Sequence, residues 1–298
     1  MKKVFEGSMV AIVTPFRDEK VDESALKELI EWQIKAGTDA IVPCGTTGES
    51  PTLSMEEHER VIEITVEVVA GRVPVIAGTG SNSTAEALRL TKHAEKCGAD
   101  ASLQVTPYYN KPTQDGIYEH FRKIAESTSL PIILYNIQGR TSVNIQPETI
   151  AKLAEIKNIV AVKEASGNLS QMSEIVHLCG DNLTLLSGDD GLTLPVLAIG
   201  GKGVISVSAN VAPEDNACLW DSWKAGDYEK AKKLFYKLLP LNKAMFIETN
   251  PIPVKSALYL MGKIGPEIRL PLTPMRGANL EKLRKAIIDY GLLKNSEA

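Results

Sequence analysis

The stretch NIVAVKEASG, residues 158–167, decides the fold class. Its four consecutive apolar residues, Ile159 to Val162, are typical of a strand that is covered on both faces, as in a parallel sheet. The run ends on Lys163, a residue type that normally avoids burial. Two interpretations of this lysine stay open: the strand has simply reached water, or the amine has a chemical task at the strand end.

Seven further short apolar or β-branched runs end, like this one, in small or polar residues. They are MVAIVTP from Met9, DAIVPCG from Asp39, VPVIAGTG from Val73, ADASLQVTP from Ala99, LPIILYN from Leu130, LTLLSGD from Leu183 and GVISVSAN from Gly203. Helical patterns separate the runs, and one of them begins with the capping-box pair Ser54 and Glu57. Eight strand–helix repeats predict an α/β fold with a parallel sheet, and eight such units that close on themselves form a (β/α)8 or TIM barrel.

A doubly wound open sheet is the alternative architecture. It is disfavoured because no GxGxxG turn follows the first strand. The length of 298 residues suits one barrel of about 250 residues with an extension. After about Asp221 the pattern becomes purely helical, so we expect a barrel catalytic domain over residues 1–224 and a C-terminal helical segment over residues 225–298.

The composition excludes several classes of function. A net charge of −4 and a pI near 5.7 give no general attraction to nucleic acid or to an anionic membrane. No apolar run approaches the ~20 residues that span a bilayer, and the first residues resemble a strand more than a signal peptide. The four cysteines form no CxxC pair and the histidines no HExxH pair, so we expect a cytoplasmic protein without a metal.

Chemically useful side chains gather at the predicted strand ends, where barrels of this type carry their active sites. These ends read GTTGES (45–50), TPYYNKP (106–112), YNIQGRT (135–141) and Lys163. A lysine in an apolar barrel mouth has a lowered pKa, and its neutral amine can form a Schiff base with a carbonyl. Tyrosine and threonine hydroxyls can relay the protons that this step requires.

The same strand ends offer two ways to hold carboxylates. The backbone N–H groups of the TTG turn can bind one, and Arg140 can grip a second in a bidentate manner. These residues therefore predict imine chemistry on a 2-keto acid with a second acidic substrate. Taken singly, each motif has a plainer interpretation, as a tight turn, a packed aromatic loop or a surface ion pair, and only their joint placement favours a site.

The sequence also resembles a known family. GTTGES, TPYYNKP, YNxxxRT, VAVKEASG and NPIPVK (250–255) stand in the order and spacing found in the pyruvate-dependent class I aldolases related to N-acetylneuraminate lyase. The resemblance implies a (β/α)8 barrel with a C-terminal helical extension and no cofactor. It also implies condensation of pyruvate with L-aspartate-4-semialdehyde, on the route to diaminopimelate and lysine. The enzyme would be built from tight dimers, and we expect a homotetramer (a dimer of dimers), with a single dimer as the alternative.

Four catalytic residues follow from the resemblance. Lys163 would be the Schiff-base lysine, and Tyr135 would donate and accept protons. Thr46 and Tyr109 would complete a proton relay, with Tyr109 reaching in from the neighbouring subunit.

Five binding residues are implied in the same way. Thr47, helped by the backbone of Gly48, would hold the pyruvate carboxylate, and Arg140 would bind the carboxylate of the semialdehyde. Gly188 and Ile205 would line the site.

One departure from the family pattern falls in the loop that carries Arg140. Many relatives have a proline where this chain has Gln138 and a glycine where it has Ser142. Losing the proline removes a fixed φ, so we expect a looser loop and altered affinity for the second substrate.

The resemblance also points to a possible lysine-effector site. Its residues would be Ser50, His58, Asn82, Glu86 and Tyr108. Met55 stands where a second histidine is common, and Pro51 where a small residue is usual. Because methionine offers no strong hydrogen bond to a charged amino acid, we expect weak or absent inhibition by lysine.

Three rival functions are considered. A sister aldolase that cleaves a 2-keto sugar acid, such as N-acetylneuraminate or 2-keto-3-deoxygluconate, would share Lys163 and Tyr135, but GTTGE followed by Arg140 favours a small acidic aldehyde. A pyridoxal-phosphate enzyme would need a phosphate cradle, and none is found. A catalytically silent barrel would be expected to lack the lysine or the tyrosines, and all are present.

Overall fold

The computed structural model describes residues 2–293, and its eight parallel strands follow the predicted runs. They are β1 Gly7–Ala11, β4 Ala40–Val42, β5 Ile76–Gly78, β6 Ala101–Val105, β7 Ile132–Asn136, β8 Ile159–Glu164, β9 Thr184–Ser187 and β10 Gly203–Ser206. A short antiparallel pair, β2 Phe16–Arg17 and β3 Lys20–Val21, lies between β1 and the first helix.

Helices alternate with these strands. They are α1 Glu23–Lys35, α2 Met55–Val69, α3 Thr84–Cys97, α4 Gln114–Glu126, α5 Gln138–Thr141, α6 Pro147–Ala154, α7 Leu169–Cys179, α8 Thr193–Ala198, α9 Pro213–Lys224, α10 Tyr228–Ala244, α11 Ile252–Leu260 and α12 Gly277–Tyr290. The part of the chain that the structure describes also has four short 3-10 helices, η1 Ser50–Thr52, η2 Gly180–Asn182, η3 Asp190–Leu192 and η4 Ser208–Asn210. Within residues 2–293, no helix has the length and apolar character needed to cross a membrane.

The chain forms two compact units. Among the described residues, the middle unit contains residues 2–7 and 74–205, and the terminal unit contains residues 8–73 and 206–293. The terminal unit thus contains most of the N-terminal quarter of the chain together with the C-terminal helices, which the sequence analysis assigns to a separate segment.

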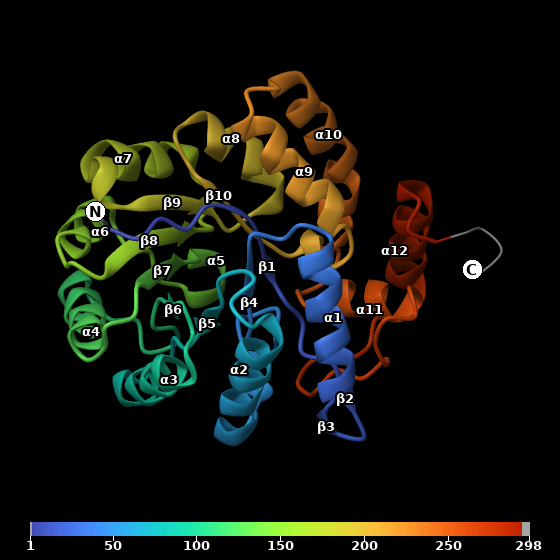
Figure 1. The fold of residues 1–298 in the computed structure, drawn as a ribbon, viewed down its shortest axis with the longest axis horizontal. Helices are drawn as coiled ribbons and strands as arrows, with labels where there is room; N and C mark the ends of the chain where they lie inside the picture. Colours follow the sequence, from blue (N-terminus) through green and yellow to red (C-terminus); the bar gives the residue numbers. More distant parts are fainter. Residues whose placement is uncertain (1, 294–298) are drawn as a thin grey trace. The chain divides into compact units, whose positions relative to one another are not determined.

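The middle unit is built on parallel strands in the order β10-β9-β8-β7-β6-β5. Helices α3, α4, α6 and α7 lie outside these strands (Figure 1). Apolar side chains from strands and helices, among them Phe121, Leu134 and Ile150, are buried between the two layers. Strands covered in this way need continuous apolar runs, which explains why the run from Ile159 to Val162 predicted its strand correctly.

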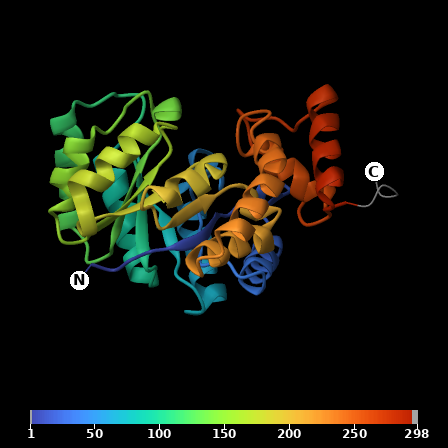
Figure 2. The ribbon, with the colours of Figure 1, turned by 90° about the horizontal axis from the view of Figure 1, so that it is seen from above.

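The terminal unit pairs β1 with β4 in parallel, with Val10 opposite Ile41. The predicted capping box is present at α2, where Ser54 and Glu57 satisfy each other's backbone N–H groups. Helix α12 packs against α10 and α11 at the C-terminal end of the chain (Figure 2). From Asp221 to Leu293 the described elements are helices only, as predicted, whereas the domain boundary after residue 224 stays a prediction.

Candidate active site

Tyr135 and Lys163 stand opposite each other on neighbouring parallel strands, β7 and β8. The amine nitrogen of Lys163 lies 4.2 Å from the centre of the Tyr135 ring, and both residues are buried. Since side chains alternate along a strand, these two project from one face of the sheet, and their successors Asn136 and Glu164 from the other. The register in which β7 pairs with β8 therefore places Tyr135 beside Lys163.

Burial decides the chemistry of the Lys163 amine. Desolvation is the main cause that lowers the pKa of Lys163; the negative charge of Asp190 opposes it and the positive charge of Arg140 adds to it, and the resulting pKa is about 8. A substantial share of neutral, nucleophilic amine is therefore present at pH 7–8. The interpretation that the strand simply reaches water at Lys163 is wrong, because only 6% of the residue is exposed.

Gly188 follows β9 and lies against the side chain of Lys163. A Cβ atom at position 188 would lie 2.7 Å from the Cβ of Ala165 and 3.1 Å from the Cγ and Cε atoms of Lys163. A side chain there would force the lysine to move, so the glycine leaves the room that the amine needs. Ile205 lies on β10 and is also buried.

The segment that carries Arg140 is the short helix α5, directly after β7, and Arg140 itself is exposed. Ser142, which replaces the usual glycine, has a φ of 59°. This left-handed conformation costs a non-glycine residue some free energy. The hydroxyl of Thr141 donates to the carbonyl of Ile137 at 3.0 Å and helps to close the turn.

A polar network that sequence reasoning missed lies behind the Tyr135–Lys163 pair. The carboxylate of Glu164, fully buried, accepts hydrogen bonds from Asn136 Nδ2 at 2.9 Å, from Gln171 Nε2 at 3.2 Å and from the backbone N–H of Ser166 at 2.7 Å. Asn136 also donates to Asn144 Oδ1 at 2.7 Å. The network ties the ends of β7 and β8 to the segment that follows Arg140.

A signal for this network was present in the sequence. Asn136 and Glu164 each come one position after a candidate catalytic residue, at the end of an apolar run. Strand alternation turns such residues toward the helical layer, where a buried polar group must find partners.

In the terminal unit, the GTTGES segment forms a tight loop after β4. The backbone N–H of Gly48 donates to the carbonyl of Gly45, and the N–H of Glu49 to that of Thr46, both at 3.1 Å. Thr47 and Gly48 are buried, whereas Thr46 is partly exposed. A Cβ at Gly48 would lie 3.0 Å from a backbone nitrogen, so only glycine fits without a shift.

The two candidate tyrosines of the TPYYNKP segment differ in exposure. Tyr109 is 89% exposed and has a φ of 70°, whereas Tyr108 is on the border between half-buried and exposed. Burial, and secondarily the charge of Glu86, raises the pKa of Tyr108. Asn82 Nδ2 donates to the backbone carbonyl of Tyr108 at 3.2 Å. The structure therefore brings together Asn82, Glu86 and Tyr108 from the predicted effector set.

The other two residues of that set lie in the terminal unit. Ser50 Oγ and His58 Nδ1 are 3.5 Å apart, and His58 is buried on α2.

The chain is similar to known proteins over almost its whole length. The sequence profile of the dihydrodipicolinate synthetase family matches residues 4–289. A relative from Thermodesulfovibrio yellowstonii, named 4-hydroxy-tetrahydrodipicolinate synthase, is 63% identical over 291 residues, which cover 98% of this chain and 100% of the relative.

Two solved structures are also closely similar. Dihydrodipicolinate synthase from Aquifex aeolicus aligns with a TM-score of 0.96 at 54% identity, covering 98% of this chain and 100% of that one. Chloride-inhibited dihydrodipicolinate synthase from Acinetobacter baumannii, crystallised with pyruvate, aligns with a TM-score of 0.95 at 48% identity, covering 97% and 100%.

The (β/α)8 barrel with C-terminal helices, together with the family match and the relatives named as synthases, identifies an enzyme of the class I aldolase type, a lyase. The chain belongs to the dihydrodipicolinate synthetase family, and its full-length relatives carry the synthase name. The predictions of fold, family, enzyme class and synthase activity are therefore confirmed.

Proposed function

We propose that this chain condenses pyruvate with L-aspartate-4-semialdehyde through an imine on Lys163. The observation that carries the proposal is the buried Lys163 amine, with its pKa lowered to about 8, 4.2 Å from the Tyr135 ring. The similarity to a relative crystallised with pyruvate supports the choice of the first substrate.

The reaction begins with attack of the neutral Lys163 amine on the keto carbon of pyruvate. The carbinolamine that forms loses its oxygen as water, with a proton delivered by the Tyr135 hydroxyl, and an imine remains. Loss of a proton from the methyl carbon gives an enamine, which attacks the aldehyde carbon of the second substrate. The amino group of that substrate then displaces Lys163 from the imine carbon and closes the ring, so one water is lost overall.

The remaining roles follow the family motifs. Thr47 and the backbone of Gly48 bind the pyruvate carboxylate, Arg140 binds the carboxylate of the semialdehyde, and Thr46 relays protons. Tyr109 completes the relay from a neighbouring subunit of a homotetramer. Its 89% exposure in a single chain supports this role, because a partner would cover it.

Chemical trapping tests the proposal directly. Borohydride added with pyruvate should leave a reduced adduct on the peptide that contains Lys163, and Lys163→Ala should abolish it. An adduct on another lysine would overturn the assignment. A coupled assay with L-aspartate-4-semialdehyde, run beside an N-acetylneuraminate cleavage assay, identifies the second substrate.

The role of Tyr109 has a separate test. Inactive Tyr109→Phe and Lys163→Ala subunits, mixed and reassembled, should recover part of the activity, because one site of each mixed pair has both groups. No recovery in mixed oligomers of proven composition would contradict a role across subunits.

A further inference from the structure

The NPIPVK motif, residues 250–255, has no role in the chemistry described above. It runs from two residues before α11 into the first turn of that helix, and it belongs to the same compact unit as the GTTGES loop, although about 200 residues separate the two in sequence. The motif contacts that loop at two points, and both contacts are buried.

The first contact joins Asn250 to Thr47. Asn250 Nδ2 donates to Thr47 Oγ1 at 3.0 Å, and 5% and 3% of these residues are exposed. A hydroxyl group carries one proton and can also accept. Because the Thr47 oxygen already accepts from Asn250, its own proton is directed to a different acceptor. A substrate carboxylate, which only accepts, suits that proton.

The second contact joins Lys255 to Glu49. The Lys255 ammonium pairs with Oε1 of Glu49 and donates to the backbone carbonyl of Thr14 at 3.0 Å. Both charged side chains are almost completely buried. Removing one partner from such a pair leaves a buried charge without compensation, which is strongly unfavourable. Glu49 has a φ of 54°, an unusual conformation that this pair helps to hold.

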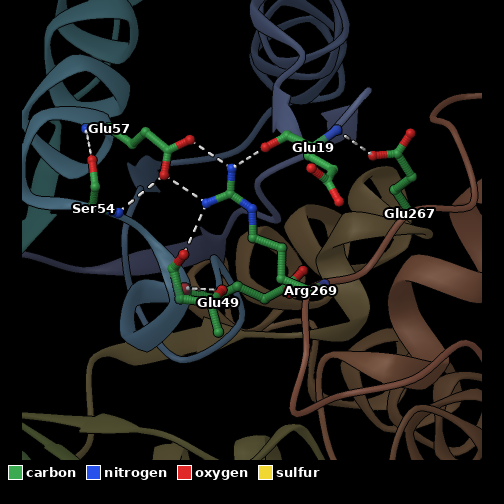
Figure 3. Close-up of polar contacts among 7 residues, drawn as sticks. Glu19, Glu49, Ser54, Glu57, Glu267 and Arg269 are labelled. Carbon is green, nitrogen blue, oxygen red and sulfur yellow. Dashed lines mark hydrogen bonds and ion pairs between the residues drawn. The ribbon is translucent and has the colours of Figure 1, made fainter.

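Arg269 binds the other oxygen of the Glu49 carboxylate. Its backbone N–H donates to Glu49 Oε2 at 3.2 Å, and its guanidinium forms a two-pronged ion pair with Glu57 of α2, at 2.5 and 2.6 Å (Figure 3). The carboxylate of Glu49 is therefore bound at both oxygens, one by Lys255 and the other by Arg269. Lys255 Nζ and the guanidinium carbon of Arg269 also each lie 4.2 Å from the centre of the Phe16 ring.

The same loop is also bound by the segment that follows β1. The Thr14 hydroxyl donates to the carbonyl of Gly48 at 2.7 Å, and Lys255 binds the carbonyl of Thr14 itself. Lys255 thus supports the loop both at Glu49 and, through Thr14, at Gly48. These contacts fix Gly48 and Glu49, and the contact with Asn250 orients the Thr47 hydroxyl.

We propose that Asn250 is a positioning residue that makes Thr47 a hydrogen-bond donor to the carboxylate of the 2-keto acid, while the Lys255–Glu49 pair holds the loop. The inference rests on the proposed function, in which Thr47 binds that carboxylate. Through Asn250, the C-terminal helical segment would then contribute to binding of the 2-keto acid.

Asn250→Asp tests the direction of this hydrogen bond. The new carboxylate has the shape of the amide but only accepts, so the Thr47 proton would turn toward it and away from the substrate. We expect the KM for pyruvate to rise about 10-fold or more, with kcat and the KM for the second substrate changed far less. Asn250→Ala, which frees the hydroxyl to rotate, should raise the pyruvate KM by a smaller factor.

A double-mutant cycle separates positioning from general support of the fold. If Asn250 acts through Thr47, Asn250→Ala should raise the pyruvate KM in the wild-type background but not in a Thr47→Val background. Equal effects in both backgrounds would overturn the inference. The cycle also decides the question if Asn250→Asp does not fold.

Asn242 provides a matched control. It is a buried asparagine on α10 in the same unit. Asn242→Asp should lower the melting temperature without changing the pyruvate KM. Trapping on the wild-type protein separates the two proposals: no pyruvate adduct on Lys163 would refute the proposed function, whereas an adduct together with an unchanged pyruvate KM in Asn250→Asp would refute only the role of Asn250.

Discussion

Tyr135 and Lys163 are register partners on adjacent parallel strands, and the lysine amine lies 4.2 Å from the centre of the tyrosine ring. Two side chains that project from a hydrogen-bonded pair of strands keep their separation without the help of a loop, which suits the reacting groups that we propose them to be. Such preorganisation lowers the entropic cost of reaching the reactive geometry.

The charges around Lys163 predict opposite shifts in the pH dependence of imine formation. Arg140 lowers the pKa of Lys163 and Asp190 raises it. Arg140→Met should therefore move the midpoint of the pH–rate curve for pyruvate trapping above about 8, and Asp190→Asn should move it below. Shifts in the same direction for both variants would show that the two charges do not set the reactivity of the amine.

The network behind the site predicts a cost for Glu164→Gln. All three hydrogen bonds to Glu164 come from N–H donors, and a glutamine would turn its own NH₂ group toward one of them. The unmet donor should cost about 1–3 kcal/mol of stability. Because the network reaches the segment after Arg140, we also expect a raised KM for the second substrate.

Gln104 is the control for Glu164. It is buried in the same unit and contacts the hydroxyls of Thr79, Thr91 and Ser102. Gln104→Glu should destabilise the protein in unfolding experiments while both KM values stay unchanged. A normal KM for the second substrate in Glu164→Gln would limit its network to a role in stability.

Gly188→Ala should impair imine formation through crowding. The added methyl group would lie 2.7 Å from the Cβ of Ala165 and 3.1 Å from two carbons of Lys163. Overpacking of this kind typically costs about 1–3 kcal/mol, and here part of it displaces the nucleophile. We expect pyruvate trapping to slow about 10-fold or more, measured by mass spectrometry of the Lys163 peptide. A second change, Ala165→Gly, should restore part of the rate; full activity of Gly188→Ala alone would contradict the prediction.

His120 predicts a loss of stability in acid. Burial lowers the pKa of this histidine to about 4, and its Nδ1 atom lies 2.9 Å from the hydroxyl of Thr84. The unfolded chain binds a proton near pH 6.5 and the folded chain does not, so the stabilisation is complete above pH 6.5 and is lost as the pH falls toward 4. Urea unfolding should show a loss of about 2 kcal/mol between pH 7 and pH 4.5, and His120→Gln should reduce this difference.

Inhibition by L-lysine should be weak, for the reason that Met55 supplies no polar partner. Met55 begins α2, the helix that carries His58. Met55→His should strengthen inhibition by about 5-fold or more if a hydrogen bond to the ligand is gained. Titrating L-lysine into the coupled assay of both proteins measures the effect; half-inhibition of the unmodified protein at submillimolar lysine would refute the prediction.

Local sequence patterns determined many of the strands and helix ends of this protein. The apolar run before Lys163 predicted a strand buried on both faces, and Ser54 with Glu57 predicted the start of α2, because burial periodicity and capping depend on residues a few positions apart. The motifs and the family resemblance also predicted that Tyr135, Lys163 and Gly188 lie near one another, as they do in the structure, since parallel strands present their carboxyl ends at one edge.

Only the tertiary structure decided how these residues are held. The partners of Thr47 and Glu49 lie 203 and 206 positions away, at Asn250 and Lys255. No periodicity links residues so distant, and the direction of a hydrogen bond depends on which donors the folded chain brings near. The protonation of the Lys163 amine also depends on the tertiary structure. Its pKa is shifted by burial and by charges that lie close to it only once the chain has folded.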